Sequence, residues 1–114
     1  YLGQVVREKS HDSLVSVNLL KEYFWNAERP LNYRADKHHT ISQELPDWFR
    51  VTNGLYMRSR EDTLREGYFL GASPLMHRVS KASGIDIDEY EDYECAMAMK
   101  AFYLRSEEAR ALAA

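Results

Sequence analysis

The chain is short of several features that would assign it to a class at once. It holds a single cysteine, Cys95, so no disulfide can form within it. Cys95 lies in a helical pattern, which favours a packed small residue over a nucleophile. The sequence has no run of 18 apolar residues, no signal peptide and no lipidation motif. We therefore expect a protein of the cytoplasm without a membrane-spanning helix. Because the chain begins at Tyr1 without a methionine, we also expect a fragment or a processed product.

An excess of positive charge is lacking as well. The sequence carries 15 basic and 18 acidic side chains, for a net charge of −3. General nucleic-acid binding requires a basic face, so this balance argues against it. Apolar residues make up 45% of the 114 residues and include eight tyrosines and two tryptophans. That composition predicts one domain, or part of one, with a modest hydrophobic core.

Hydrophobic periodicity predicts an α/β protein with a mixed sheet. Residues 13–19 alternate apolar with small polar side chains, which predicts a strand in the interior of the sheet. Ser59 and Asp62 resemble a capping box that opens a short helix, and Gly67 is a natural residue to end it. The remaining predicted elements are the end of a helix over 1–10, an extended piece over 23–25, strands over 48–58 and 75–79, and a long helix from Glu89 towards Leu104.

Residues 26–47 interrupt this pattern with a polar excursion of weak periodicity. A loop this long in a small domain is normally functional or packs on a partner chain. His38 and His39 could be metal ligands, but adjacent side chains point apart in an extended chain. A solvated loop is the better interpretation of the two histidines.

An acidic stretch over residues 84–94 is the most informative part of the sequence. Read as a strand end, Ile85 and Ile87 face one side, and Asp86 and Asp88 face the other. The two carboxylates would lie about 6–7 Å apart. Their repulsion would cost about 2.5 kcal/mol at an effective dielectric near 20. Such a pair requires water, a proton, a helix to cap or a divalent cation.

Helix capping is the structural alternative for this stretch. Asp88 is a good N-cap, with Glu91 three residues further on as its capping-box partner. Capping does not account for Asp86. An EF-hand loop is excluded because its sixth position, which requires Gly, is Glu91.

Asn53 and Gly54 lie within a predicted strand and allow two interpretations. They form a hairpin turn, or they mark a place where the backbone approaches a ligand. Tyr56, Tyr68 and Phe69, taken by themselves, are typical of core aromatics.

Four blocks follow one another along the chain: Ser13-Leu14-Val15-Ser16-Val17, Gln43-Glu44-Leu45-Pro46, Asn53-Gly54-Leu55-Tyr56, and Ile85-Asp86-Ile87-Asp88 followed by Asp92 and Ala96. Together they resemble the C-terminal half of the acylneuraminate cytidylyltransferases, the CMP-sialic acid synthetases. Their order and spacing match over residues 12–104. The family's N-terminal half carries a basic, glycine-containing nucleotide-binding loop that has no counterpart in these 114 residues.

The resemblance implies that residues 1–114 are the C-terminal portion of a Rossmann-like nucleotidyltransferase domain. The reaction would be Mg²⁺-dependent and would convert CTP and a sialic-acid-like sugar acid into a CMP-sugar and pyrophosphate. Asp86 and Asp88 match the family's catalytic, metal-binding acids. Residues 26–47 match an arm through which members form homodimers. The positions that match the substrate site are Gln43, Asn53, Gly54, Tyr56, Tyr68 and Phe69.

One departure concerns the substrate. Members commonly have an Arg before the residue that matches Gln43, and here that position is Ser42. This leaves room for a related sugar acid. The alternative function is a non-catalytic dimerisation or interaction module, in which the aromatic-rich strands and the excursion form the interface and the acids are helix caps.

Overall fold

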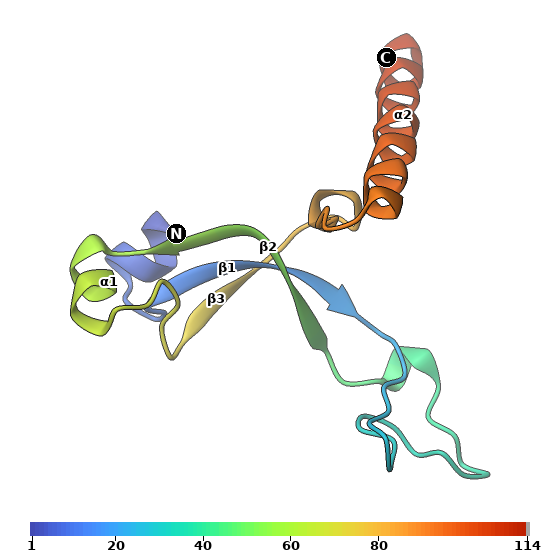
Figure 1. Cartoon of the computed structure of the whole chain (residues 1–114), viewed down its shortest axis with the longest axis horizontal. Helices are drawn as coiled ribbons and strands as arrows, with labels where there is room; N and C mark the ends of the chain where they lie inside the picture. The colour runs from blue at the N-terminus through green and yellow to red at the C-terminus, as the bar shows by residue number, and fades with distance from the viewer. Residues whose placement is uncertain (114) are drawn as a thin grey trace.

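A three-stranded mixed sheet forms the centre of the molecule (Figure 1). The structure, a computed structural model, describes residues 1–113, with side chains as far as Glu107. The strands are β1 (Ser13–Leu20), β2 (Trp48–Arg58) and β3 (Pro74–Arg78), in the spatial order β2-β1-β3. β1 pairs antiparallel with β2 and parallel with β3. The predicted mixed α/β class is confirmed, as is the interior position of the strand that follows Asp12.

The core is small and is built on β1. Residues 13–18 are all buried. The buried apolar side chains of the described residues are Leu14, Val15, Val17 and Leu45. The polar side chains of β1 are buried too, and each has hydrogen-bond partners, as buried polar groups require. Ser13 Oγ, for example, donates to Asp12 Oδ1 at 2.8 Å and accepts from the Gly71 N–H at 2.9 Å.

The short helix after β2 forms as predicted. α1 spans Arg60–Glu66, and Ser59 Oγ accepts the Asp62 N–H at 3.0 Å. The Asp62 carboxylate in turn accepts the Ser59 hydroxyl at 2.6 Å. The helix ends at Gly67, whose φ of 67° is a left-handed conformation that glycine adopts without strain.

The long C-terminal helix, α2 (Tyr90–Ala113), begins one residue after the predicted start and continues beyond Leu104. Figure 1 shows it extending away from the sheet. A cavity of about 220 Å³ lies between the short helix η3 (Ala82–Gly84) and the α2 residues Ala96, Met99, Lys100 and Tyr103. A short π-helix, η1 (Leu2–Arg7), with hydrogen bonds between residues five apart, stands near the start of β1 (Figure 1).

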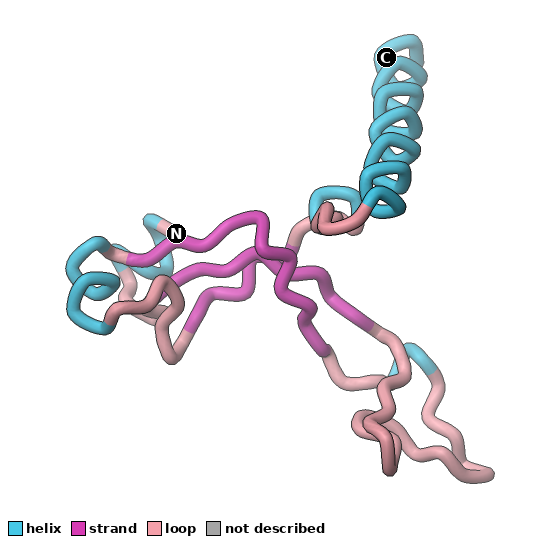
Figure 2. Tube along the Cα trace, in the orientation of Figure 1, coloured by secondary structure: helices cyan, strands magenta, loops and turns pink. Residues whose placement is uncertain are grey.

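The excursion between β1 and β2 is mostly loop, with one short helix, η2 (Ser42–Glu44) (Figure 2). The extended piece predicted over residues 23–25 is wrong, since Trp25 makes only an isolated bridge to Pro30. Aromatic packing replaces the ladder there, because the Tyr23 ring lies 4.7 Å from Tyr33 and 4.9 Å from His39. Leu45, with an exposed fraction of 2%, anchors the excursion against the sheet.

Candidate functional site

A large bulge in β2 creates the candidate site. Val15 of β1 pairs with Tyr56, whereas Val17 pairs with Val51, so residues 52–55 all stand opposite the single residue Ser16. The Ser16 hydroxyl compensates for the interrupted ladder by accepting the Leu55 N–H at 2.9 Å and the Thr52 hydroxyl at 2.8 Å. Bulges of this kind redirect side chains and are common beside functional sites. Asn53 and Gly54 therefore lie in a bulge, and the hairpin-turn interpretation is wrong.

Asn53 joins two parts of the chain through both ends of its amide. Its φ is 56°, a left-handed conformation that Asn tolerates better than most residues. Nδ2 donates to Asp86 Oδ2 at 2.8 Å, and Oδ1 accepts the Tyr56 hydroxyl at 2.7 Å. Because one contact needs a donor and the other an acceptor, the amide orientation is fixed.

An aromatic pair extends this connection. Phe69 packs edge-on against Tyr56, with ring centroids 4.6 Å apart, and lies 4.5 Å from Tyr68. Tyr68 and Phe69, which form the aromatic pair, are both exposed. We call the connected set Asp86, Asn53, Tyr56, Phe69 and Tyr68 the Asn53 cluster. It brings together five of the eight residues that the sequence predicted for the site.

Arg58 holds the aromatic pair in place and was not predicted from the sequence. Its side chain is 4% exposed and forms a 2.5 Å ion pair with Glu66. Nη1 donates to the carbonyls of Tyr68 at 2.9 Å and Leu70 at 3.4 Å. The sequence gave no signal of this role. The partners of Arg58 lie 8 to 12 residues further on, and they reach it only because the chain turns back towards β2 after α1.

A second unpredicted residue, Asn18, positions the acidic end of the cluster. Asn18 is 2% exposed, and its Nδ2 donates to the carbonyls of Val79 and Ser80, each at 3.0 Å. Its Oδ1 accepts from Arg50 Nη2 at 2.9 Å. The buried Gly84 packs on the Asn18 amide, and this contact fixes where the chain emerges towards Asp86. An Asn in a predicted interior strand was the signal that could have revealed it.

A cavity of about 310 Å³ opens beside Asp86. Arg50, Asp92 and Cys95 also line it, so a cation and two carboxylates share one hollow. Cys95 is exposed, which makes the prediction of a packed cysteine wrong. Among the described residues, no group of three or more His, Cys, Asp and Glu side chains is arranged to hold a metal ion.

The strand end predicted over residues 85–88 is wrong. The segment is irregular, and Ile87 is 55% exposed, so the expected alternation does not form. Asp88 is not the helix cap either. The Asp92 carboxylate accepts the N–H groups of Asp88 at 3.2 Å and Glu89 at 3.0 Å. A side chain in the first turn of α2 thus provides the hydrogen-bond acceptor for the backbone N–H groups at the start of the helix. Asp86 and Asp88 are both exposed, and Asp86 is the one that lines the cavity.

The remaining predicted residues lie as follows. Gln43 is in η2 at the base of the excursion, where its Oε1 accepts the Ser42 hydroxyl at 3.3 Å. It is not part of the Asn53 cluster. Gly54 has no positive φ, and a Cβ there would meet Ser16 Oγ at 3.6 Å, an ordinary contact. The backbone conformation and packing therefore do not explain why this position is glycine.

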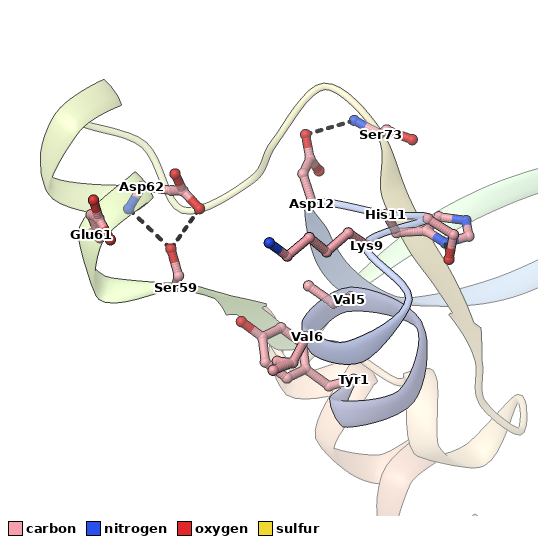
Figure 3. A pocket seen from close by; sticks show the side chains of 11 residues that line it. Tyr1, Val5, Val6, Lys9, His11, Asp12, Ser59, Glu61, Asp62 and Ser73 are labelled. Carbon is pink, nitrogen blue, oxygen red and sulfur yellow. Dashed lines mark hydrogen bonds between the residues drawn. The ribbon is translucent and has the colours of Figure 1, made fainter.

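A second, larger cavity of about 540 Å³ lies between η1 and the start of α1 (Figure 3). Asp12 and Asp62 line it, and Figure 3 shows the Lys9 side chain extending in their direction. Burial alone would raise the pKa of Asp12, but hydrogen bonds from Ser13, Ser73 and Ala72 hold it below its ordinary value. The Ser59 hydroxyl and Arg65 likewise lower the pKa of Asp62. Both carboxylates thus serve the fold, and we assign this cavity no function.

Comparison with known proteins does not add to this description. No protein-family model and no curated protein sequence matches the chain. Within residues 1–113, no helix has both the length and the apolar character needed to cross a membrane.

Proposed function

We propose that this chain is the C-terminal portion of a cytoplasmic, Mg²⁺-dependent CMP-sugar synthetase with a Rossmann-like nucleotidyltransferase fold. One observation carries the proposal. Asn53, Asp86 and the Tyr68–Phe69 pair come from three separate segments, and they form one connected cluster. The resemblance assigned these same residues to the metal and substrate sites.

The residues of the cluster suit a sugar acid. Exposed aromatic rings pack against the apolar parts of a sugar and its acyl group. The Asn53 amide and the Tyr56 hydroxyl are neutral hydrogen-bonding groups that can bind its hydroxyls. Arg50, in the adjoining cavity, supplies a positive charge towards anionic groups. On this proposal Gly54 permits a close approach of substrate to the backbone.

Asp86 and Asp88 would hold the magnesium ion. Carboxylate oxygens are the ligands that Mg²⁺ prefers, and the ion usually completes its shell with water and substrate phosphates. Of the two acids, Asp86 lines the cavity and Asp88 lies outside its lining, so the site would fill only when nucleotide brings further oxygen ligands. When bound, the ion would neutralise charge that develops on the phosphoryl group.

Titration calorimetry tests the metal assignment. Asp86→Asn keeps an oxygen that accepts from Asn53 but removes the charge, and Glu61→Ala removes an exposed carboxylate on α1 as the control. We expect CTP with Mg²⁺ to give a weak, Mg²⁺-dependent heat with the wild type and the control. Asp86→Asn should lose that heat, because the ion loses a charged ligand. Equal heats for all three proteins would exclude Asp86 as a ligand.

A dimerisation module is the second candidate, and the dimensions of the chain favour it. The Cα radius of gyration is 18.4 Å, whereas a compact chain of this length has about 13 Å. Trp25, directly before the excursion, and Leu31, within it, are 55% and 45% exposed. Large exposed aromatic and aliphatic groups are typical of interface centres.

Deleting residues 28–40 tests whether the excursion is a dimer interface or a solvated surface loop. If the excursion forms the dimer interface, the deletion should lower the molecular mass, measured by analytical ultracentrifugation, from dimer to monomer. An unchanged dimer would exclude the excursion as the interface. Calorimetry on the same deletion shows independently whether the Asn53 cluster still binds ligand.

A further inference from the structure

α2 exposes large apolar side chains on more than one side, because Phe102 (60% exposed) and Tyr103 (42% exposed) lie apart from the set that repeats along one face. At 100° per residue, the half-buried residues Asp92, Ala96, Met99 and Ser106 fall together on one side of the helix. Two of them, Ala96 and Met99, line the cavity shared with η3. The far side presents a second set of residues within an arc of about 80°. This set, which we call the α2 stripe, is Tyr90, Tyr93, Met97, Ala101 and Leu104.

The α2 stripe has the spacing of a helix–helix interface. Tyr90, Tyr93, Met97 and Leu104 follow intervals of three, four and seven residues, as core positions of paired helices do. Their exposed fractions are 74%, 46%, 47% and 50%. An isolated helix draws most of its stability from packing such a face, so an exposed stripe indicates a missing partner.

The charges beside the stripe specify which partner fits. Glu94 and Arg105 flank it on the same side, three turns apart, and Glu89 and Lys100 flank it on the other side. Two parallel copies would set Glu94 against Glu89 and Arg105 against Lys100, so like charges would meet. Two antiparallel copies would set Glu94 of each helix beside Arg105 of the other. Glu107 and Glu89 approach each other only at the exposed ends, where water screens their repulsion.

We propose that α2 pairs with α2 of a second copy of this chain, in antiparallel orientation, through the α2 stripe. This interface is separate from the excursion and does not depend on the proposed enzymatic activity. Tyr93 of one copy then packs near Leu104 of the other, and Met97 lies near the two-fold axis. The symmetry makes every contact occur twice, as in an isologous dimer.

A charge swap tests the pairing in the full chain. We expect Glu94→Arg and Arg105→Glu each to raise the dimer dissociation constant about tenfold, because each replaces two attractions with two repulsions. The double variant E94R/R105E restores opposite charges across the interface. It should therefore return the dissociation constant close to that of the wild type. Sedimentation equilibrium measures all four proteins.

Glu91→Arg is the matched control, because Glu91 lies on α2 well away from the stripe. It should leave the dissociation constant within about threefold of the wild type. Met97→Glu should abolish the dimer, with the helix content followed by circular dichroism. A monomeric wild type would overturn the proposal. So would single reversals that leave the dimer unchanged, or a double variant that dissociates as readily as the singles.

Discussion

At the scale of single residues, Asn53 combines an unusual backbone conformation with two specific side-chain hydrogen bonds. Its positive φ disfavours most side chains, and its amide must donate to Asp86 and accept from Tyr56. An aspartate there would oppose the Asp86 carboxylate, and an aliphatic residue would satisfy neither partner. The bulge of β2 thus favours Asn for its backbone conformation as well as for its two hydrogen bonds.

Substituting Asn53 separates these two requirements. Asn53→Gly keeps the left-handed backbone and removes both hydrogen bonds, so the unfolding free energy should fall by about 1 kcal/mol. Asn53→Ala adds the left-handed penalty and should lose about 2 kcal/mol. Urea denaturation measures both changes.

Lys9, with a φ of 52°, is the control for backbone strain. Lys9→Gly should raise stability slightly, because it relieves strain without removing a hydrogen bond of the cluster. Both Asn53 variants should also lose the Mg²⁺-dependent heat. An Asn53→Gly protein that binds as the wild type does would remove Asn53 from the proposed site.

At the scale of elements, the segment from β3 to α2 decides where the acids lie. Ser80 and Ser83 close the turn, with their hydroxyl oxygens 2.8 Å apart, and Gly84 then packs on β1 and β2. A Cβ on Gly84 would overlap the Asn18 amide and approach Thr52 Cγ2 to 2.8 Å. The glycine is needed here for close approach, since its φ is not positive.

Gly84→Ala therefore tests the placement of the whole segment. The clash involves a buried amide held by three hydrogen bonds, so we expect a loss of about 1–3 kcal/mol in unfolding free energy. Gly54→Ala is the matched control, because its Cβ would make only ordinary contacts and its stability should change little.

The two glycine variants differ in a second readout. If substrate approaches the backbone at Gly54, Gly54→Ala should weaken sugar-acid binding while the fold stays intact. A Gly84→Ala protein as stable as Gly54→Ala would show that the segment does not rest on Asn18 and Thr52.

At the scale of the whole molecule, the core is small and the outline is extended. Charged hydrogen bonds and ion pairs therefore contribute a larger share of the folding stability than in a compact domain. Depressed carboxyl pKa values occur at both ends of the sheet. Arg58 and Arg65 lower the pKa of Glu66, and Lys21 and Arg78 lower that of Asp47. Glu66, Asp47 and Asp12 tie segments outside the strands to the sheet through Arg58, Arg78 and Ser13, whereas Asp62 bonds within α1 and its cap.

Acid should therefore destabilise the chain in a defined direction. A carboxyl whose folded-state pKa lies below its unfolded value contributes stability above about pH 4, and that stability is lost as the pH falls through the folded value. The urea midpoint should stay nearly constant from about pH 7 to 5 and fall steadily below about pH 4.

Asp12→Asn is the variant that identifies one source of this loss. It should lower the midpoint at pH 7 and flatten the acid transition, because the amide presents the Ala72 and Ser73 N–H groups with a weaker acceptor. A midpoint that rises on acidification would contradict the assignment of these carboxylates.

The sequence by itself determined the elements whose signals are local. The alternation over residues 13–19 predicted β1, and Ser59 and Gly67 predicted both ends of α1, because capping and periodicity depend on neighbours along the chain. The resemblance also named Asn53, Tyr56 and Asp86 before any geometry joined them.

Only the tertiary structure decided how those pieces meet. The bulge opposite Ser16, the support of Tyr68 and Phe69 by Arg58, and the packing of Gly84 on Asn18 all join residues far apart in sequence. The expected strand over residues 85–88 failed for the same reason. The sequence alternates there, but among residues 1–113 no neighbouring strand supplies the hydrogen bonds that a strand needs, and the Asp92 carboxylate instead accepts the N–H groups that precede α2.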